Sequence, residues 1–444
     1  MRIQLSDHFT YSKLIRFVLP SITMMIFTSI YSIVDGLFVS NFVGKTSFAA
    51  INLIFPLFMI IGAVGFMIGN GGSAIVAKTF GEGKAELANR YFSMLVYITI
   101  FAGVIFTILG QIFLVPVSEF LGAEGEMLEN CVIYGRILLC GFVFFLLQIT
   151  FESFLIAAEK PKLGLLVTVL AGLTNIILDA LFIVVFDWGL VGAAVATTIS
   201  QVLAGSIPLI YFIRKNDSLL QLGKTEFYGK ILGKTCVNGS SEMMSNISAS
   251  IVTVLYNWQL LRLAGENGVA AYGVIMYVNF IFIAILFGYS MGSAPIVSFH
   301  YGAGNHGELQ NLFRKSLKLM GGAGVVLAIL SFALSRPLAS IFVGYDPVLL
   351  EMTVHGYRIF LLTFLLCGFP IFGSAFFTAL NNGLVSAAIS FLRTLVFECA
   401  AVMILPIFLG LDGVWSSIIV AEFMSLVITV FFWLKLNKKY HYIR

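Results

Sequence analysis

Long apolar stretches alternate with short polar segments along almost the whole chain. Twelve stretches are long enough to cross about 30 Å of hydrocarbon as a helix, which takes about 20 residues. They cover residues 14–40, 47–76, 92–116, 129–157, 163–186, 189–213, 236–261, 269–297, 312–335, 349–379, 384–409 and 412–434. Because these runs are continuous and do not alternate in polarity, they predict helices and not the strands of a membrane barrel. The expected fold is an all-α integral membrane protein with twelve transmembrane helices.

The composition supports placing most of the chain in lipid. Hydrophobic residues make up 59% of the 444 positions and charged residues only 11%, with a mean hydropathy of +0.99, whereas soluble domains carry about 25% charged residues. So few charges cannot cover a water-facing surface of this size, which excludes a large soluble enzyme or a nucleic-acid-binding protein. The five cysteines are odd in number and lack CxxC spacing, so they predict neither a disulfide framework nor a metal site.

The basic residues predict the orientation of the spans. Of the 26 Lys and Arg residues, 20 fall on one side, in the N-terminal segment, the loops around 78–90, 160–162, 214–234 and 314–318, and the tail 435–444. Basic residues are retained in cytoplasmic loops. We therefore expect a multi-pass membrane protein with both termini in the cytoplasm.

The chain also contains an internal repeat. A shift of 221 residues aligns the two halves, with matches that cluster at corresponding loops, such as Gly81 and Gly83 with Gly302 and Gly304. Six spans per half is an even number, so both halves enter the membrane in the same direction and form a parallel repeat. The predicted organisation is an N lobe at 1–213, a cytoplasmic linker at 214–235 and a C lobe at 236–444.

Two acidic residues lie deep inside N-lobe spans, where an ionisable group costs at least about 2.5 to 3.5 kcal/mol. Asp35 follows Tyr31 by one helical turn, and Asp179 follows Asn175 by one turn. At about 1.5 Å per residue, these acids and Thr197 lie about 9 to 14 Å below the outer surface. If they face one another, they could share a proton or hold Na⁺; alternatively, each acid only hydrogen-bonds a neighbouring helix.

Further ionisable groups form a second, weaker set of candidates. Glu398 and Glu422 lie deep in spans eleven and twelve without an acidic partner at their depth, and Arg393 could pair with Glu398. Each is interpreted either as part of a structural ion pair or as a second cation-attracting group, and Glu398 is expected to matter less for transport than the N-lobe acids. Glu152 and Glu242 lie near helix ends, where solvated acids are ordinary.

Proline and glycine mark places where helices bend or loops turn. Pro20 lies inside the first span, fifteen residues before Asp35, and its missing amide donor predicts a kink that serves either packing or a moving hinge. The segments GEG at 81–83 and GAG at 302–304 lack the context of a nucleotide-binding loop and predict tight turns between spans. The chain has no HExxH or Walker A motif, so neither enzymatic activity nor ATP-driven transport is expected.

The segments SIYSIVDGLFVSNFVG, TNIILDALFI and GLVGAAVAT, together with the two glycine loops, resemble the multidrug and toxic compound extrusion (MATE) family over essentially the whole chain. They are most similar to its DinF-like branch, which includes MepA-type bacterial pumps. The resemblance implies a cation-coupling site at Asp35, Asn175, Asp179 and Thr197, with Tyr31 beside them. It also implies export of amphipathic, often cationic compounds by antiport with H⁺ or Na⁺, through alternating access at a V-shaped cleft.

The resemblance further implies a transporter with no cofactor beyond the coupling ion, and we expect it to act as a monomer. A related branch of the family uses acids in the middle of spans seven and ten; here Glu242 and Glu351 lie at helix ends and do not match that pattern.

An alternative function is a flippase for lipid-linked oligosaccharides or lipids, from the wider superfamily. Such a protein would need several basic residues in its cleft to bind a pyrophosphate, and only Arg136, Arg358 and Arg393 lie within spans. A membrane scaffold or receptor, in turn, would give no reason for two acids at matched depth.

Overall fold

The computed structural model describes residues 3–443, apart from the side chains of Leu37, Ser40, Asn41 and Lys45. The described part is helical and contains no strand. The first half forms seven α-helices, two of which continue into a π-helical turn. They are α1 (Tyr11–Phe38) with η1 (Val39–Val43), α2 (Lys45–Gly81), α3 (Ala85–Phe120), α4 (Gly125–Cys140), α5 (Phe142–Ala157), α6 (Pro161–Asp179) with η2 (Ala180–Val185), and α7 (Gly189–Ile213).

The second half begins with the longest element, α8. Its helices are α8 (Gly229–Gly302), α9 (His306–Val343), α10 (Pro347–Phe360) joined through η3 (Leu361–Thr363) to α11 (Phe364–Ala379), α12 (Gly383–Phe391) joined through η4 (Leu392–Phe397) to α13 (Glu398–Leu409), and α14 (Leu411–Tyr440).

The twelve expected spans are present once two bends are taken into account. A 74-residue helix would be about 110 Å long, but α8 breaks at Gly265, whose φ of 62° is not helical, and so provides two spans. The helices α4 and α5 meet at 60° and together make one span. The twelve-helix prediction is therefore confirmed.

The internal repeat is visible in the backbone. Glycines with positive φ recur at matching positions of the two halves: Gly44 and Gly265, Gly83 and Gly304, and Gly189 and Gly410. Glycine is favoured where φ is positive because it has no Cβ to clash. The predicted tight turns at GEG and GAG are confirmed by the second of these pairs.

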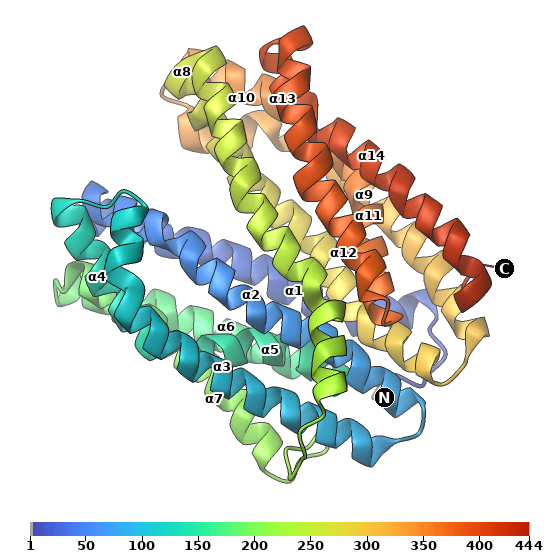
Figure 1. Cartoon of the computed structure of the whole chain (residues 1–444). Coiled ribbons are helices and arrows are strands. Elements are labelled where there is room, and N and C mark those ends of the chain that lie inside the picture. Colours follow the sequence, from blue (N-terminus) through green and yellow to red (C-terminus); the bar gives the residue numbers. More distant parts are fainter. Residues whose placement is uncertain (1–2, 444) are drawn as a thin grey trace.

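The helices form two lobes, α1–α7 and α8–α14 (Figure 1). The lobes meet at the end of the molecule that carries both chain termini, which we call the terminal end. They diverge toward the opposite end, which holds α4 and the bend of α8 and which we call the far end (Figure 1).

Glycines bring the lobes together toward the terminal end. A methyl group on Gly81 would collide with the carbonyl oxygen of Phe299, and one on Gly302 with that of Lys78. Gly239 similarly lies against the backbone of Met67. Helices in membranes approach this closely only through small residues, so these contacts close the lobes against each other at the terminal end.

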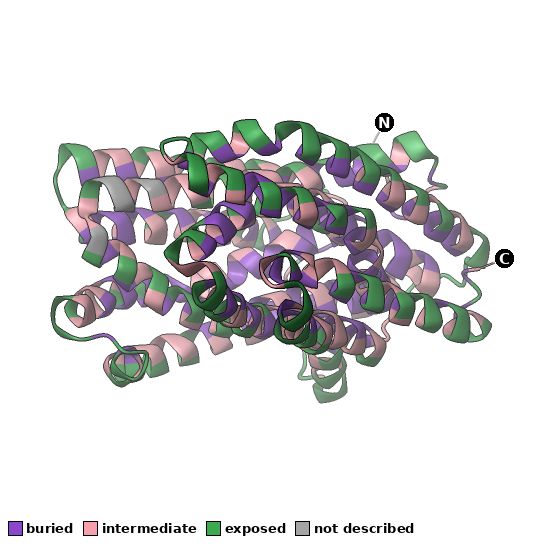
Figure 2. Cartoon of the chain, turned by 90° about the horizontal axis from the view of Figure 1, so that it is seen from above, coloured by how far each residue is buried: buried purple, intermediate pink, exposed green. Residues whose placement is uncertain are grey.

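The outward faces of the helices are apolar. Buried residues gather toward the middle of the molecule, and exposed ones follow the outside (Figure 2). Many large apolar side chains are among the exposed, including Phe101, Ile112, Ile329 and Phe408. A surface of this kind suits lipid and not water, as expected of a multi-pass membrane protein.

Candidate coupling site in the N lobe

Close packing of α1 against α6 sets the geometry of the candidate site. Gly172 on α6 lies against the rings of Phe27 and Tyr31, and a Cβ there would be 3.1 Å from a ring carbon of Tyr31. A larger residue would push the two helices apart. Gly172 therefore allows the polar face of α1 to lie beside the polar face of α6.

The two N-lobe acids meet. The carboxyl groups of Asp35, on α1, and Asp179, at the end of α6, lie close enough to each other to interact directly. Asp179 is fully buried, and neither of its oxygens, nor Oδ1 of Asp35, has a hydrogen-bond donor in the described part of the chain. Two charged carboxylates cannot remain in contact in such a place. Two carboxyl groups in this position can share a proton or another single positive charge.

Asn175 and Thr197 lie beside the acids but bond to each other. The side-chain nitrogen of Asn175 donates to the hydroxyl of Thr197, on α7, at 3.4 Å. Neither side chain donates to the unpartnered oxygens of Asp179. These two residues therefore border the acid pair and do not ligate it in this conformation.

Tyr134, on α4, is a residue of this site that the sequence reasoning missed. It is 5% exposed, lies beside Thr197 and is close enough to both acids to interact with them electrostatically. Its depth could have indicated it: Tyr134 comes nine residues after the far-end start of α4, and Thr197 comes eight after the far-end start of α7.

Tyr31 connects the site to a second polar group. Its side chain lies close to that of Gln148, on α5, as well as to Asp35 one turn away. Gln148 also lies beside Glu152, one turn closer to the terminal end. Glu152, interpreted above as an ordinary solvated end group, thus has a polar neighbour within the protein and lies on a polar path from the acids toward the terminal end.

Glu242 likewise has a polar neighbour. It lies beside Asn70, on α2, which accepts a hydrogen bond from Ser153 at 2.5 Å. This contact joins α8 of the C lobe to α2 and α5 of the N lobe near the terminal end.

The secondary candidates are paired differently from the prediction. Arg393, in η4, binds Glu422, on α14, with three hydrogen bonds of 2.7 to 3.1 Å. Glu398 forms no salt bridge in the described part of the chain, and its carboxyl interacts instead with the hydroxyl of Tyr256, on α8. The expected pairing of Arg393 with Glu398 is wrong, because Glu422 takes up the guanidinium group.

Three of the deep acids, Asp35, Asp179 and Glu398, lie at or within four residues of a π-helical turn. Asp35 is followed by η1, Asp179 by η2, and Glu398 is preceded by η4. π-Helical turns are rare in proteins as a whole. They are frequent at functional sites, because they disturb the regular hydrogen bonding of the helix.

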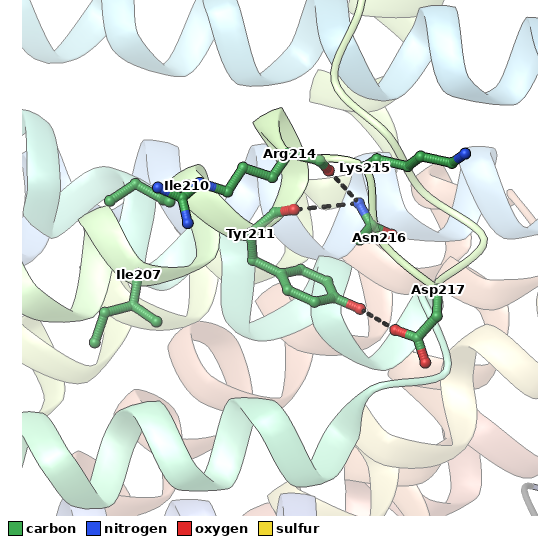
Figure 3. A pocket seen from close by; sticks show the side chains of 7 residues that line it. All are labelled: Ile207, Ile210, Tyr211, Arg214, Lys215, Asn216 and Asp217. Atoms are coloured by element: carbon green, nitrogen blue, oxygen red, sulfur yellow. Dashed lines mark hydrogen bonds between the residues drawn. The ribbon is translucent and has the colours of Figure 1, made fainter.

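A surface hollow at the end of α7 lies elsewhere and has a different character (Figure 3). There Asp217 accepts hydrogen bonds from Lys160 at 2.5 Å and from Tyr211 at 3.0 Å, which lower its pKa to about 2. Tyr211 is fourteen residues from Thr197 on the same helix, or about 21 Å. These hydrogen bonds attach the linker to α7. The hollow is separate from the acid pair.

Comparison with known proteins identifies the family. The MatE family model matches residues 20–181 and 243–402, once in each lobe and over more than half of the chain. The chain belongs to the MatE family. The resemblance found in the sequence is thereby confirmed, and the chain is a membrane transporter and not an enzyme.

Relatives of known structure and name extend over nearly the whole chain. The MatE protein described here is 24% identical to the multidrug export protein MepA of Staphylococcus aureus, over 93% of this chain and 91% of that protein. A crystal structure of MATE in the straight conformation superposes with a TM-score of 0.92 at 24% identity, covering 97% of both chains. An outward-facing multidrug resistance MATE family transporter gives 0.91 at 24% identity, covering 96% and 95%. The whole two-lobe fold is thus shared.

Proposed function

We propose that this MatE protein exports amphipathic, often cationic small molecules across the bacterial plasma membrane by antiport with H⁺, through alternating access. Its membership of the family and its similarity to multidrug export proteins over more than nine-tenths of the chain support export. The observation that supports proton coupling is the contact between Asp35 and Asp179.

A proton suits this contact better than Na⁺. A bound metal ion lies between its oxygen ligands and would hold the two carboxyl groups apart, whereas a proton joins them directly. The side-chain nitrogen of Asn175 donates to the hydroxyl of Thr197, so Na⁺ would compete with this hydrogen bond for the oxygen of Thr197. We therefore propose H⁺ as the coupling ion. The test must distinguish it from Na⁺.

Loading and release of the proton would drive the change of access. With the glycine contacts closed at the terminal end, the acid pair takes its proton from the far-end side, which is outside the cell in this proposal. Protonation removes a negative charge between α1, α6 and α7 and so alters how they pack. Pro20, within the otherwise continuous α1, is the proposed hinge. One charge moving down about 100 mV releases about 2.3 kcal/mol, close to a fiftyfold substrate gradient.

Proteoliposomes loaded with a fluorescent cationic dye provide the test. A pH gradient without Na⁺ should drive dye transport, and a Na⁺ gradient at equal pH should not. Asp35→Asn should abolish gradient-driven transport while dye binding to purified protein persists, because the amide resembles the protonated acid. Glu351→Gln, which neutralises an acid 61% exposed at the surface, is the matched control and should transport normally.

Two outcomes would contradict the proposal. Full coupled transport by the double variant Asp35→Asn, Asp179→Asn would exclude the acid pair as the coupling site. Transport that requires Na⁺ would exclude H⁺ as the coupling ion and retain the site.

No observation favours the flippase alternative. Arg393 is bound to Glu422, Arg136 is exposed, and Arg358, also exposed, lies over the ring of Phe332. These side chains do not converge to bind a pyrophosphate.

Both lobes and the complete acid pair come from one chain, which supports a monomer as the transporting unit.

A further inference from the structure

The internal repeat relates the N-lobe acid pair to a pair of side chains in the C lobe. Moving 221 residues along the chain takes Asp35 to Tyr256, and Asp179 to within two residues of Glu398. These C-lobe side chains also meet, since the hydroxyl of Tyr256 interacts with the carboxyl of Glu398. The C lobe therefore holds a counterpart of the acid pair in which a tyrosine replaces one carboxyl group.

The surroundings of this counterpart leave its charge unbalanced. Arg393 and Glu422 neutralise each other through their three hydrogen bonds. When Glu398 is ionised, the cluster carries one negative charge that no basic side chain of the described chain matches by a salt bridge. The titratable or charged groups that act on Glu398 come from its own span, from α14 and from both halves of α8: Arg393, Cys399, Glu422, Tyr256 and Tyr272.

Tyr256 is fixed and directed at the carboxyl group. It is 1% exposed and stacks on Tyr272 with ring centroids 4.8 Å apart and planes 6° apart. Its buried hydroxyl has no hydrogen-bond partner of normal geometry in the described part of the chain. Among the neighbouring side chains, Glu398 interacts with it most strongly. An unsatisfied hydroxyl held in this way costs free energy unless Glu398 interacts with it.

Glu398 itself is partly exposed, while Glu422 and both tyrosines are buried. It lies near the middle of the span formed by α12, η4 and α13. Bound metal ions need several oxygen ligands, whereas among the described residues the carboxyl group of Glu398 meets the hydroxyl of Tyr256, and the nearby carboxyl group of Glu422 is bound by Arg393. A proton needs only a single acceptor atom, and the carboxyl group of Glu398 is not fully buried.

We propose that Glu398 is a second proton-binding site, located in the C lobe and exchanging its proton during the transport cycle. It binds a proton from water on the side to which the lobes are open and releases it to the opposite side after they rearrange. Its exchange during the cycle rests on the proposed antiport, whereas proton binding itself does not. The transporter then carries one proton in each lobe.

Infrared difference spectroscopy of purified protein across a pH jump tests this without transport. The background is the double variant Asp35→Asn, Asp179→Asn, which removes the N-lobe pair. The carbonyl-stretch signal of a protonated carboxyl group should fall when Glu398→Gln is added, by about one carboxyl group per molecule, and Glu398→Asp should restore it at a shifted frequency. Glu351→Gln in the same background should leave this signal unchanged.

Transport stoichiometry tests the exchange. In proteoliposomes, the substrate gradient that just balances an imposed pH gradient gives the number of protons per substrate. Glu398→Gln should lower this number by about one and still transport. An infrared signal equal in the double and triple variants would overturn the site, even if the wild type transports. An unchanged proton number in a Glu398→Gln variant that transports would overturn its exchange. If the wild type does not transport when a pH gradient is imposed, the proposed antiport is contradicted. The infrared result is independent of that outcome.

Discussion

The depth of a residue in the membrane could be predicted from the sequence by counting from a helix end. The side chain that it contacts on another helix could not. Asp35 and Asp179 were expected to meet because counting residues from the ends of their spans puts both acids at the same depth in the membrane. The partner of Arg393 could not be found in this way. Its five-residue spacing to Glu398 would put the two about 140° apart around a regular helix, and Glu422 reaches it from another helix.

The ion pair of Arg393 and Glu422 should stabilise the C lobe. The side chains are 13% and 4% exposed, and removing one partner of a buried pair typically costs about 3 to 5 kcal/mol because a charge is left unpaired. Glu422→Gln should therefore lower the thermal unfolding midpoint in detergent by several degrees. Replacing both, as Arg393→Met with Glu422→Leu, should recover most of that loss. A double variant as unstable as the single one would mean that the pair itself is not the cause.

At the scale of elements, the spans were predictable and their irregularities were not. The bilayer imposes the length of each apolar run, so hydropathy alone located the twelve spans. The π-helical turns, the 60° bend between α4 and α5 and the polar path through Gln148 depend on packing between helices that are distant in sequence. Gly81 and Gly302 were recognised as turn residues, but their backbone contacts with the opposite lobe follow only from the structure.

These contacts give a prediction about the closed terminal end. Gly302→Ala places a methyl group against the carbonyl oxygen of Lys78, and such overpacking costs about 1 to 3 kcal/mol. The variant should open the terminal end more often. In a cysteine-free background, a Thr235→Cys probe, fully buried on α8, should then react faster with a membrane-permeant maleimide.

Gly322→Ala provides the control for this experiment, because a methyl group on Gly322 meets nothing within 4 Å. It should leave the labelling rate of the probe unchanged. Equal rates in the Gly302→Ala and Gly322→Ala variants would show that the glycine contacts do not hold the lobes together.

For the whole molecule, the repeat supplies one architecture and the two lobes use it for different chemistry. Matching positions hold two carboxyl groups in the N lobe, and a carboxyl group with a tyrosine hydroxyl in the C lobe. A sequence comparison of the halves finds the shared glycines, since the fold requires them. It does not reveal the second pair, because Glu398 is displaced by two residues and Tyr256 is of a different residue type.

The orientation of the molecule gives the last prediction. Basic residues gather at the terminal end, and positively charged loops remain in the cytoplasm, so the linker should lie inside the cell. A Lys224→Cys probe in the linker should not react with an impermeant maleimide on intact cells and should react once they are permeabilised. Glu266→Cys, an exposed position beside the bend of α8 at the far end, should react on intact cells. The opposite pattern would invert the molecule, and with it the side from which both carboxyl sites take their protons.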